Sequence, residues 1–288
     1  MVISQILGGL GNQMFQYAAA RALALSRAQP LLLDLAEFDS YKLHNGFELD
    51  RVFVINSAAA KTGDLLPVLG WRTPALVRKV LKRRLFAPLR GAHLAIEPAP
   101  NYWPRLQTIE SPLYMMGYWQ SERYFLMQEN TIRTDFCFRR ALEGRDAALA
   151  AEMADTPSVS VHLRRGDYLS DQVMDICSLD YYRSAAKHME ERIGHPTYYV
   201  FSDDADWVRS HVNFLPDATF IDHNKGQDSY KDMHLMSRCK HHIIANSSFS
   251  WWGAWLNPSA EKIVAAPRTW FRDGRDDSDH VPSQWIRL

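Results

Sequence analysis

Two adjacent arginines, Arg164 and Arg165, stand at the end of a short β-branched run in residues 159–168. A guanidinium group binds phosphate oxygens through paired hydrogen bonds and keeps its charge throughout the physiological pH range. In an open α/β sheet, ligands bind beyond the carboxyl ends of the strands, which is where this run delivers its charges. The pattern therefore predicts a diphosphate site, with a structural ion pair between Arg165 and Asp167 as the alternative.

A glycine-rich turn at residues 8–13 connects a predicted strand to a predicted helix. Glycines let the backbone approach a ligand closely, and the N-terminus of the following helix favours an anion. The turn lacks the third glycine of the GxGxxG dinucleotide fingerprint, whereas Asn12 and Gln13 add amides suited to sugar hydroxyls. A tight turn that binds nothing is the alternative interpretation.

A serine-rich segment, residues 246–255, follows an apolar run and opens a predicted helix. Serine or asparagine at the N-cap, followed by unpaired backbone N–H groups, makes an anion site that can act together with Arg164. Ordinary helix capping is the alternative. The tryptophans of this segment are expected to pack in the core or between domains.

Two acidic segments add further candidates. The carboxylates of Asp204 and Asp206 are spaced to hold Mg²⁺ beside a nucleotide, but helix capping is the favoured interpretation. A second acidic helix start, residues 228–237, places a carboxylate that can pair with the donor edge of guanine; for Asp228, capping is the alternative.

Composition narrows the classes of protein. The 288 residues carry 33 basic and 33 acidic side chains, so no net charge attracts nucleic acid. Three widely spaced cysteines favour a reducing compartment over a disulfide framework. The N-terminus lacks the pattern of a signal peptide, and no apolar run approaches the roughly 20 residues of a membrane span. We therefore expect a soluble intracellular protein.

Apolar runs alternate with helix-like stretches, which predicts βαβ units and mainly parallel sheets in an α/β fold. The predicted strands are 2–7, 31–35, 159–163, 198–202, 219–222, 242–245 and 262–266. The predicted helices are 14–27, 180–193, 204–213, 228–240 and 248–256. We predict two domains, residues 1–150 and 151–288, joined by a linker at 155–157.

Five motifs in one order resemble the bacterial α-1,2-fucosyltransferase family, over about residues 3–267. They are residues 8–17, 117–125, 162–168, 201–204 and 246–252. The resemblance implies an inverting transfer of L-fucose from GDP-β-L-fucose to the 2-hydroxyl of a terminal galactoside in a bacterial glycan, with no metal or other cofactor. It also implies two Rossmann-like domains that face a cleft, the GT-B architecture, with the acceptor on the N-terminal domain and the donor on the C-terminal one.

The resemblance also implies roles for individual residues. Arg164 would neutralise the β-phosphate of the leaving GDP, with His162 in support, and Asn12 would sit by the reaction centre. Asp232 would read guanine. The other expected donor contacts are Gly11, Gln13, Arg165, Asp167, Ser202, Asp203, Asn246, Ser247, Ser248 and Phe249.

The general base stays open, because inversion requires a carboxylate or histidine near the acceptor hydroxyl. The candidates are Asp39, His44, Asp171 and Asp175, and Gln172 occupies the position of a glutamate found in related α-1,6-fucosyltransferases. Alternative functions are a fucosyltransferase of another linkage, a metal-dependent sugar-nucleotide transferase, and a nucleotide- or glycan-binding protein without catalysis, dinucleotide-dependent enzymes included.

Residues 72–90 contain seven basic side chains and no acidic one. Val77, Val80, Leu81 and Leu85 follow helical spacing, which predicts an amphipathic basic helix. One hypothesis is peripheral contact with the inner membrane of a bacterium, beside a lipid-linked acceptor. The favoured alternative is a core-packed helix with a solvated basic face.

Overall fold

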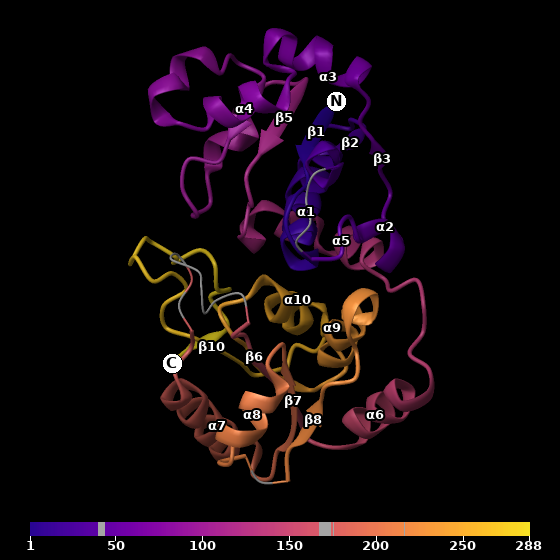
Figure 1. The fold of residues 1–288 in the computed structure, drawn as a ribbon, viewed down its shortest axis with the longest axis vertical. Helices are drawn as coiled ribbons and strands as arrows, with labels where there is room; N and C mark the ends of the chain where they lie inside the picture. Colours follow the sequence, from indigo (N-terminus) through magenta and orange to yellow (C-terminus); the bar gives the residue numbers. More distant parts are fainter. Residues whose placement is uncertain (40–43, 167–173, 175, 216) are drawn as a thin grey trace. The chain divides into compact units, whose positions relative to one another are not determined.

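The computed structural model describes residues 1–288 except 40–43, 167–173, 175 and 216 (Figure 1). The chain forms two compact units. The N-terminal unit comprises Met1–Arg139 with Ser278–His280, and the C-terminal unit comprises Arg140–Asp277 with Val281–Leu288. These compact units meet after Arg139. Residue 150, the end of the first domain in our prediction, lies inside the helix α6 (Gly144–Asp155), and residues 155–157 lie within the C-terminal unit.

A parallel sheet forms the centre of the N-terminal unit, in the order β3-β2-β1-β5-β4. Strands β2 and β3 extend the sheet on one side of β1, whereas β5 and β4 lie on the other, so the topology switches between β1 and β5. The strands are β1 (Val2–Gln5), β2 (Leu31–Asp34), β3 (Ala58–Ala59), β4 (Leu94–Ile96) and β5 (Leu113–Met116).

The helices of this unit include α1, which leaves the glycine-rich turn and is almost fully buried. Its small and apolar residues let it pack closely on the sheet, and it starts four residues earlier than predicted. The helices are α1 (Leu10–Ser26), α2 (Leu49–Val52), α3 (Thr62–Leu69), α4 (Ala75–Leu81) and α5 (Glu129–Asp135).

The sheet of the C-terminal unit runs in the order β11-β10-β9-β6-β7-β8 and is also parallel. Its strands are β6 (Ser158–Leu163), β7 (Thr197–Ser202), β8 (Thr219–Ile221), β9 (His241–Ile243), β10 (Val264–Ala266) and β11 (Ile286–Arg287). The helices that follow α6 are α7 (Leu179–Ile193), α8 (Ala205–His211), α9 (Tyr230–Met236) and α10 (Ser248–Leu256). The predicted alternation of strands and helices is confirmed.

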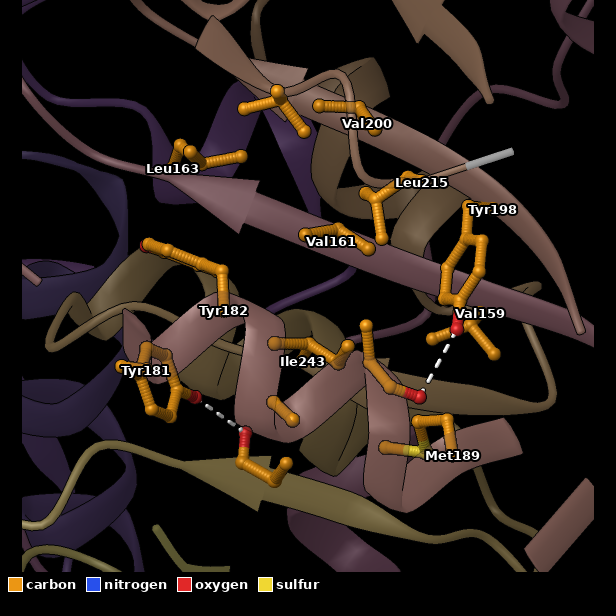
Figure 2. Packing of buried hydrophobic residues seen from close by; sticks show 14 of the residues in the cluster. Val159, Val161, Leu163, Tyr181, Tyr182, Met189, Tyr198, Val200, Leu215 and Ile243 are labelled. Atoms are coloured by element: carbon orange, nitrogen blue, oxygen red, sulfur yellow. Dashed lines mark hydrogen bonds between the residues drawn. The ribbon is translucent and has the colours of Figure 1, made fainter. Parts of the chain in front are cut away.

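The core of the C-terminal unit forms where α7 packs on β6 and its neighbours (Figure 2). Buried tyrosines contribute rings to this core, and their hydroxyl groups still find partners. Tyr181 donates a hydrogen bond to the backbone oxygen of Ala265 at 3.0 Å, and Tyr198 donates one to Ala186 at 3.2 Å. The face of β6 that carries Val159, Val161 and Leu163 is therefore buried against α7, in a core whose tyrosine hydroxyl groups are hydrogen-bonded.

The prediction of one amphipathic basic helix over residues 72–90 is wrong in two respects. Helix α4 ends at Leu81, and a 3-10 turn, η3 (Arg84–Leu89), follows it. Arg78 is not a surface cation: it is 2% exposed, and its guanidinium pairs with Asp34 at 2.9 Å. Tyr114 donates to the same carboxylate at 2.6 Å, which completes a buried polar cluster.

Within the described part of the chain, no helix is both long and apolar enough to span a membrane.

Candidate functional site

The arginine motif and the serine motif of the C-terminal unit meet at the carboxyl edge of its sheet, beside the topological switch. Strands β7 and β8 extend the sheet on one side of β6, while β9 and β10 lie on the other. Arg164 directly follows β6, and Ser247 lies at the start of α10, just after β9. Ligands of open α/β sheets bind at this point, so the fold brings the two predicted anion-binding motifs together.

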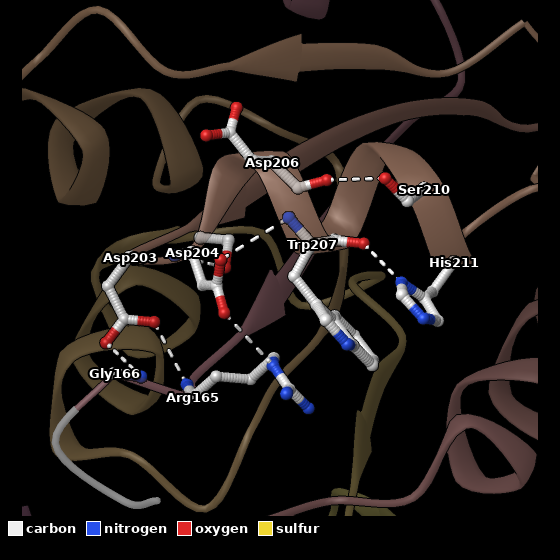
Figure 3. Close-up of polar contacts among 9 residues, drawn as sticks. Arg165, Gly166, Asp203, Asp204, Asp206, Trp207, Ser210 and His211 are labelled. Carbon is white, nitrogen blue, oxygen red and sulfur yellow. Dashed lines mark hydrogen bonds and ion pairs between the residues drawn. The ribbon is translucent and has the colours of Figure 1, made fainter.

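Asp203, just after β7, organises the arginine motif. Its carboxylate pairs with Arg164 at 3.1 Å. It also accepts backbone hydrogen bonds from Arg165 at 2.9 Å and Gly166 at 3.1 Å (Figure 3). The side chains of Arg164 and Asp203 are each 23% exposed, so the guanidinium is held in place and still reaches solvent. Asp203 was expected to contact the donor; in this structure it positions the arginine that would.

Arg165 is fixed by a different set of neighbours. Its guanidinium lies 3.4 Å from the centre of the Trp207 ring, and its Nε lies 3.4 Å from Asp204 (Figure 3). Asp204 also caps α8 by accepting a hydrogen bond from the Trp207 backbone at 3.3 Å. The favoured capping interpretation of Asp204 is thus confirmed, and its carboxylate also pairs with an arginine.

His162 lies inside β6 and is buried. Burial, helped by the positive charge of Arg164 and opposed by the charge of Asp203, lowers the pKa of its imidazole to about 4. The ring is therefore neutral at neutral pH and cannot add a positive charge to a phosphate site. It lies 5.9 Å from the ring of Phe249, measured between ring centres, which links β6 to the first turn of α10.

The serine motif builds the first turn of α10. Ser247 is the N-cap and accepts a hydrogen bond from the Phe249 backbone at 3.4 Å, while Ser248 is the first, half-buried residue of the helix. The carboxamide of Asn246 donates to the backbone oxygen of Trp270 at 2.9 Å and accepts from the thiol of Cys177 at 3.4 Å. Asn246 therefore supports the loop; its expected contact with the donor stays a prediction.

Ser202 ends β7 and accepts a hydrogen bond from the Asp204 backbone at 3.0 Å. This contact shapes the acidic turn from within. The expected contact of Ser202 with the sugar-nucleotide donor stays a prediction.

Asp232 lies in the first turn of α9 in a polar cluster. Asn224 donates hydrogen bonds to Asp232 at 2.9 Å and to Asp146 at 3.1 Å, and His223 pairs with Asp146 at 2.7 Å. Burial, with a smaller contribution from the charges of Asp146 and Asp222, raises the pKa of Asp232 to about 7 against the effect of the Asn224 hydrogen bond. A carboxylate held in this way is available to bind hydrogen-bond donors once it ionises.

The N-terminal unit carries its own polar edge at the switch between β1 and β5. Asn12 lies in the first turn of α1, which follows β1, and Gln120 lies in the loop after β5; the Gln120 carboxamide donates to the Asn12 side-chain oxygen at 2.7 Å. A Cβ atom on Gly8, which has a φ of 82°, would lie 2.9 Å from the Asn12 amide nitrogen. The positive φ and this close approach both favour glycine at position 8, next to the Asn12 side chain.

Gln13 and His44 shape the same turn. The Gln13 carboxamide donates to the backbone oxygens of Gly8 and Gly46, both at 2.8 Å, and accepts from the Glu48 backbone at 2.9 Å. These bonds use Gln13 inside the protein, so its donor contact, like that of Gly11 in the first turn of α1, stays a prediction. The ring of His44 lies close to Gly9 at the N-terminus of α1.

Glu97, directly after β4, is a site residue that sequence reasoning missed. Its carboxylate accepts backbone hydrogen bonds from Tyr118 at 2.7 Å and Trp119 at 2.9 Å, and so anchors the loop that carries Gln120. Burial raises its pKa to about 7 against the effect of these two hydrogen bonds. The signal in the sequence was one acidic residue at the end of an apolar run, which spacing alone does not link to residue 118.

Some expected residues fall outside the described part of the chain. Asp167, Asp171 and Asp175 are among them, so two candidates for the general base and one donor contact have no structural account. Asp39 is exposed at the end of a 3-10 turn. Within the described residues, no group of three or more His, Cys, Asp or Glu side chains is arranged to hold a metal ion.

Comparison with known proteins identifies the family. Residues 91–288 match the model of glycosyl transferase family 11. Over its full length the chain is 35% identical to an α-1,2-colitosyltransferase of Escherichia coli, of which it covers 99%. It is 31% identical to the O-antigen biosynthesis glycosyltransferase WbnK of Escherichia coli, with 99% of each chain covered. It is 26% identical to human galactoside α-(1,2)-fucosyltransferase 1, with 86% of this chain and 63% of the relative covered.

Solved structures support the fold. The fucosyltransferase NodZ from Bradyrhizobium superimposes with a TM-score of 0.54 at 15% identity, over 88% of this chain and 90% of NodZ. This likeness agrees with the two parallel sheets and confirms the predicted GT-B fold class. The chain belongs to glycosyl transferase family 11, the family of the galactoside α-1,2-fucosyltransferases.

Proposed function

We propose that this enzyme transfers L-fucose from GDP-β-L-fucose to the 2-hydroxyl of a terminal galactoside in a bacterial glycan, with inversion at the anomeric carbon. One observation carries the proposal: a half-buried arginine and the N-terminus of α10 flank the topological switch of the C-terminal sheet. Two features that favour a phosphate thus converge at the point where such sheets bind ligands.

The charges of this site suit the departure of GDP. As the bond to the sugar breaks, negative charge develops on the β-phosphate, and a positioned guanidinium stabilises that charge more in the transition state than before it. Asp203 holds Arg164 in place for this role. Because His162 is neutral, it would contribute packing and a hydrogen bond, and Arg164 would supply the charge.

The other residues take supporting roles in the proposal. Asp232 would accept hydrogen bonds from guanine, and Ser248 with the first N–H groups of α10 would bind a phosphate. Asn12, oriented by Gln120, would act on the acceptor side, next to the reacting sugar. NodZ has been co-crystallised with GDP, which supports a guanine nucleotide as the ligand of this fold.

A second donor sugar is favoured by one comparison. The relative that is 35% identical over the full chain is named a colitosyltransferase. Colitose is L-fucose without its 3-hydroxyl, so the two donors differ in one group. A site that hydrogen-bonds this hydroxyl would reject GDP-colitose strongly, by up to about 10⁴-fold, whereas an apolar site would discriminate only about 10²-fold or less.

The acceptor would be a galactose-terminated oligosaccharide, free or lipid-linked, on the cytoplasmic side of the inner membrane. Human galactoside α-(1,2)-fucosyltransferase 1 supports the galactoside, and WbnK, named for O-antigen biosynthesis, supports a bacterial surface glycan.

The test measures GDP release from GDP-fucose and from GDP-colitose, with and without lactose, in excess EDTA. Lactose-dependent release with an α-1,2-linked product is the expected result, and the ratio of kcat/KM values names the donor sugar. Loss of release in EDTA, restored by Mg²⁺, would replace the proposal with a metal-dependent transferase.

Two variants connect the activity to the geometry. Arg164→Ala should lower kcat by about 10²–10³-fold, because it removes the charge that meets the leaving phosphate. Arg209→Ala is the matched control, since Arg209 pairs with Asp222 at the surface of the same unit, and should leave kcat within about twofold. Equal activity of both variants would exclude Arg164 from the reaction.

A further inference from the structure

Residues 71–89 expose an unusual group of large apolar side chains. Leu85 is 82% exposed and Leu76 is 75% exposed. Their neighbours in this group are Trp71, Val80 and Leu89, each at least two-fifths exposed. Single exposed leucines are ordinary on soluble proteins, but a cluster of this size on one short segment marks an interaction surface.

Helix α4 has one face that is exposed and another that packs into the core. Leu76 and Val80 are one helical turn apart and therefore lie on the same face. Val77 and Leu81 lie on another face and pack into the core of the N-terminal unit. The core is thus complete without Leu76 and Val80.

Two arginines hold the segment together as one piece. Arg72 donates a hydrogen bond to the backbone oxygen of Leu89 at 2.6 Å, which ties the turn at Trp71 to the end of η3. Arg90 donates to the backbone oxygens of Leu81 at 2.9 Å and Lys82 at 3.0 Å, which ties η3 to α4. The exposed side chains are therefore presented by a compact, braced structure.

Exposed cations lie among these apolar side chains along the segment. They are Lys79, Lys82, Arg83 and Arg84, and the sequence has no acidic residue between Asp64 and Glu97. Within α4, Lys79 follows Leu76 by three residues, so the helix places these two side chains on the same side. Arg83 lies beyond the end of α4, at the start of η3. We call the nine side chains Trp71, Leu76, Lys79, Val80, Lys82, Arg83, Arg84, Leu85 and Leu89 the basic apolar surface.

We propose that the basic apolar surface binds the face of an anionic lipid bilayer. Cations mixed with leucines and a tryptophan match such a face, because the cations meet lipid phosphates while the apolar side chains enter the headgroup boundary. Each cation near an anionic membrane raises affinity by about fivefold. The inference goes beyond the transfer reaction and depends on neither the donor nor the acceptor assigned above.

Co-sedimentation of the full chain with lipid vesicles tests this proposal. The protein should pellet with phosphatidylcholine vesicles that contain phosphatidylglycerol, and should stay in solution with phosphatidylcholine alone. Leu76→Glu/Leu85→Glu and Lys79→Glu/Arg83→Glu should each lower the bound fraction at least about tenfold. Activity on soluble lactose should stay unchanged in both, which shows that the variants fold and separates this result from the transfer reaction.

The matched control uses exposed apolar residues elsewhere in the same unit. Leu126 and Met127 are exposed on another 3-10 turn, so Leu126→Glu/Met127→Glu should bind vesicles as the native protein does. Binding that ignores phosphatidylglycerol, or that survives both surface variants, overturns the proposal. Self-association that depends on concentration and is lost in Leu76→Glu/Leu85→Glu, without vesicle binding, would make the surface an interface between copies instead.

Discussion

Replacing Asp232 by Asn should weaken GDP binding and change its dependence on pH. The guanine base offers two N–H donors on one edge, and an ionised carboxylate can accept both. Burial raises the pKa of Asp232 to about 7, so in the free protein this carboxyl is only partly ionised at neutral pH. If guanine binds only the ionised carboxylate, binding must therefore release the proton from Asp232.

The size of the effect follows from the pKa. Between about pH 6 and about pH 8, the ionised fraction of a group with this pKa rises from roughly one tenth to roughly nine tenths. Apparent affinity scales with the competent fraction, so GDP should bind about tenfold more tightly at the higher pH. Asn cannot ionise and accepts with one oxygen only, so Asp232→Asn should lose about 1.5–3 kcal/mol at about pH 8, or roughly 10–100-fold in affinity.

Isothermal titration with GDP at several pH values measures this effect. Because the terminal phosphate of GDP itself titrates near pH 6, the informative quantity is the ratio of native to variant affinity at each pH. This ratio should rise with pH. Inosine diphosphate, which lacks the 2-amino group, should bind the native protein more weakly than GDP does. The variant should bind inosine diphosphate and GDP equally well.

Asp228→Asn is the matched control, because Asp228 lies one turn earlier, is 59% exposed and pairs with Lys231. It should bind GDP like the native protein. If Asp232→Asn keeps native affinity at every pH, or discriminates inosine diphosphate as well as the native protein does, Asp232 does not read the base.

Four further predictions concern the frame of the site. Asp203→Asn removes the carboxylate that holds Arg164, so kcat should fall about tenfold or more while folding, followed by circular dichroism, is retained; native kcat would contradict this. Glu97→Gln weakens the anchor of the loop that carries Gln120, so it should lower kcat more than it changes the KM for GDP-fucose. Glu97→Asp should keep part of the native kcat; a change in KM alone would contradict this prediction. Arg78→Ala leaves a buried carboxylate unpaired and should cost about 3–5 kcal/mol in urea unfolding, against less than about 0.5 for Lys79→Ala. Because the pKa of His162 is lowered in the folded protein, its imidazole takes up a proton in the unfolded chain first as the pH falls below about 6.5. The free energy of unfolding should therefore decline from that pH toward pH 4, and His162→Gln should flatten this decline.

The fold was predictable because its sheets are parallel and buried. A buried parallel strand is a short apolar run, and the connecting helices recur at regular spacing, so the strands β6 to β10 were each found within a few residues. The last strand, β11 (Ile286–Arg287), was missed because two residues give no periodicity. The place of Arg164 also followed from the sequence, since a residue that follows a central strand lies at the edge where ligands bind.

Contacts between distant residues were not predictable. Arg78 looks like its basic neighbours in the sequence, yet it is buried because Asp34 and Tyr114, from two other strands, meet it in the core. Glu97 acquires its role only because β4 and β5 are adjacent, which brings it to the loop after β5. Periodicity reports which face of a helix is apolar, but not which charged residue finds a partner across the fold.

The acidic residues after β7 show how charge can be arranged around a phosphate site. A carboxylate beside a phosphate would repel it. The sequence suggested a metal or a capping role for Asp204, and a contact with the donor for Asp203. Each carboxylate pairs with one arginine of the motif, Asp203 with Arg164 and Asp204 with Arg165. The pairing fixes the guanidinium groups before any ligand arrives, and a prepositioned charge costs no reorganisation during the reaction. Acidic residues at this edge therefore serve the proposed anion site by ordering its arginines.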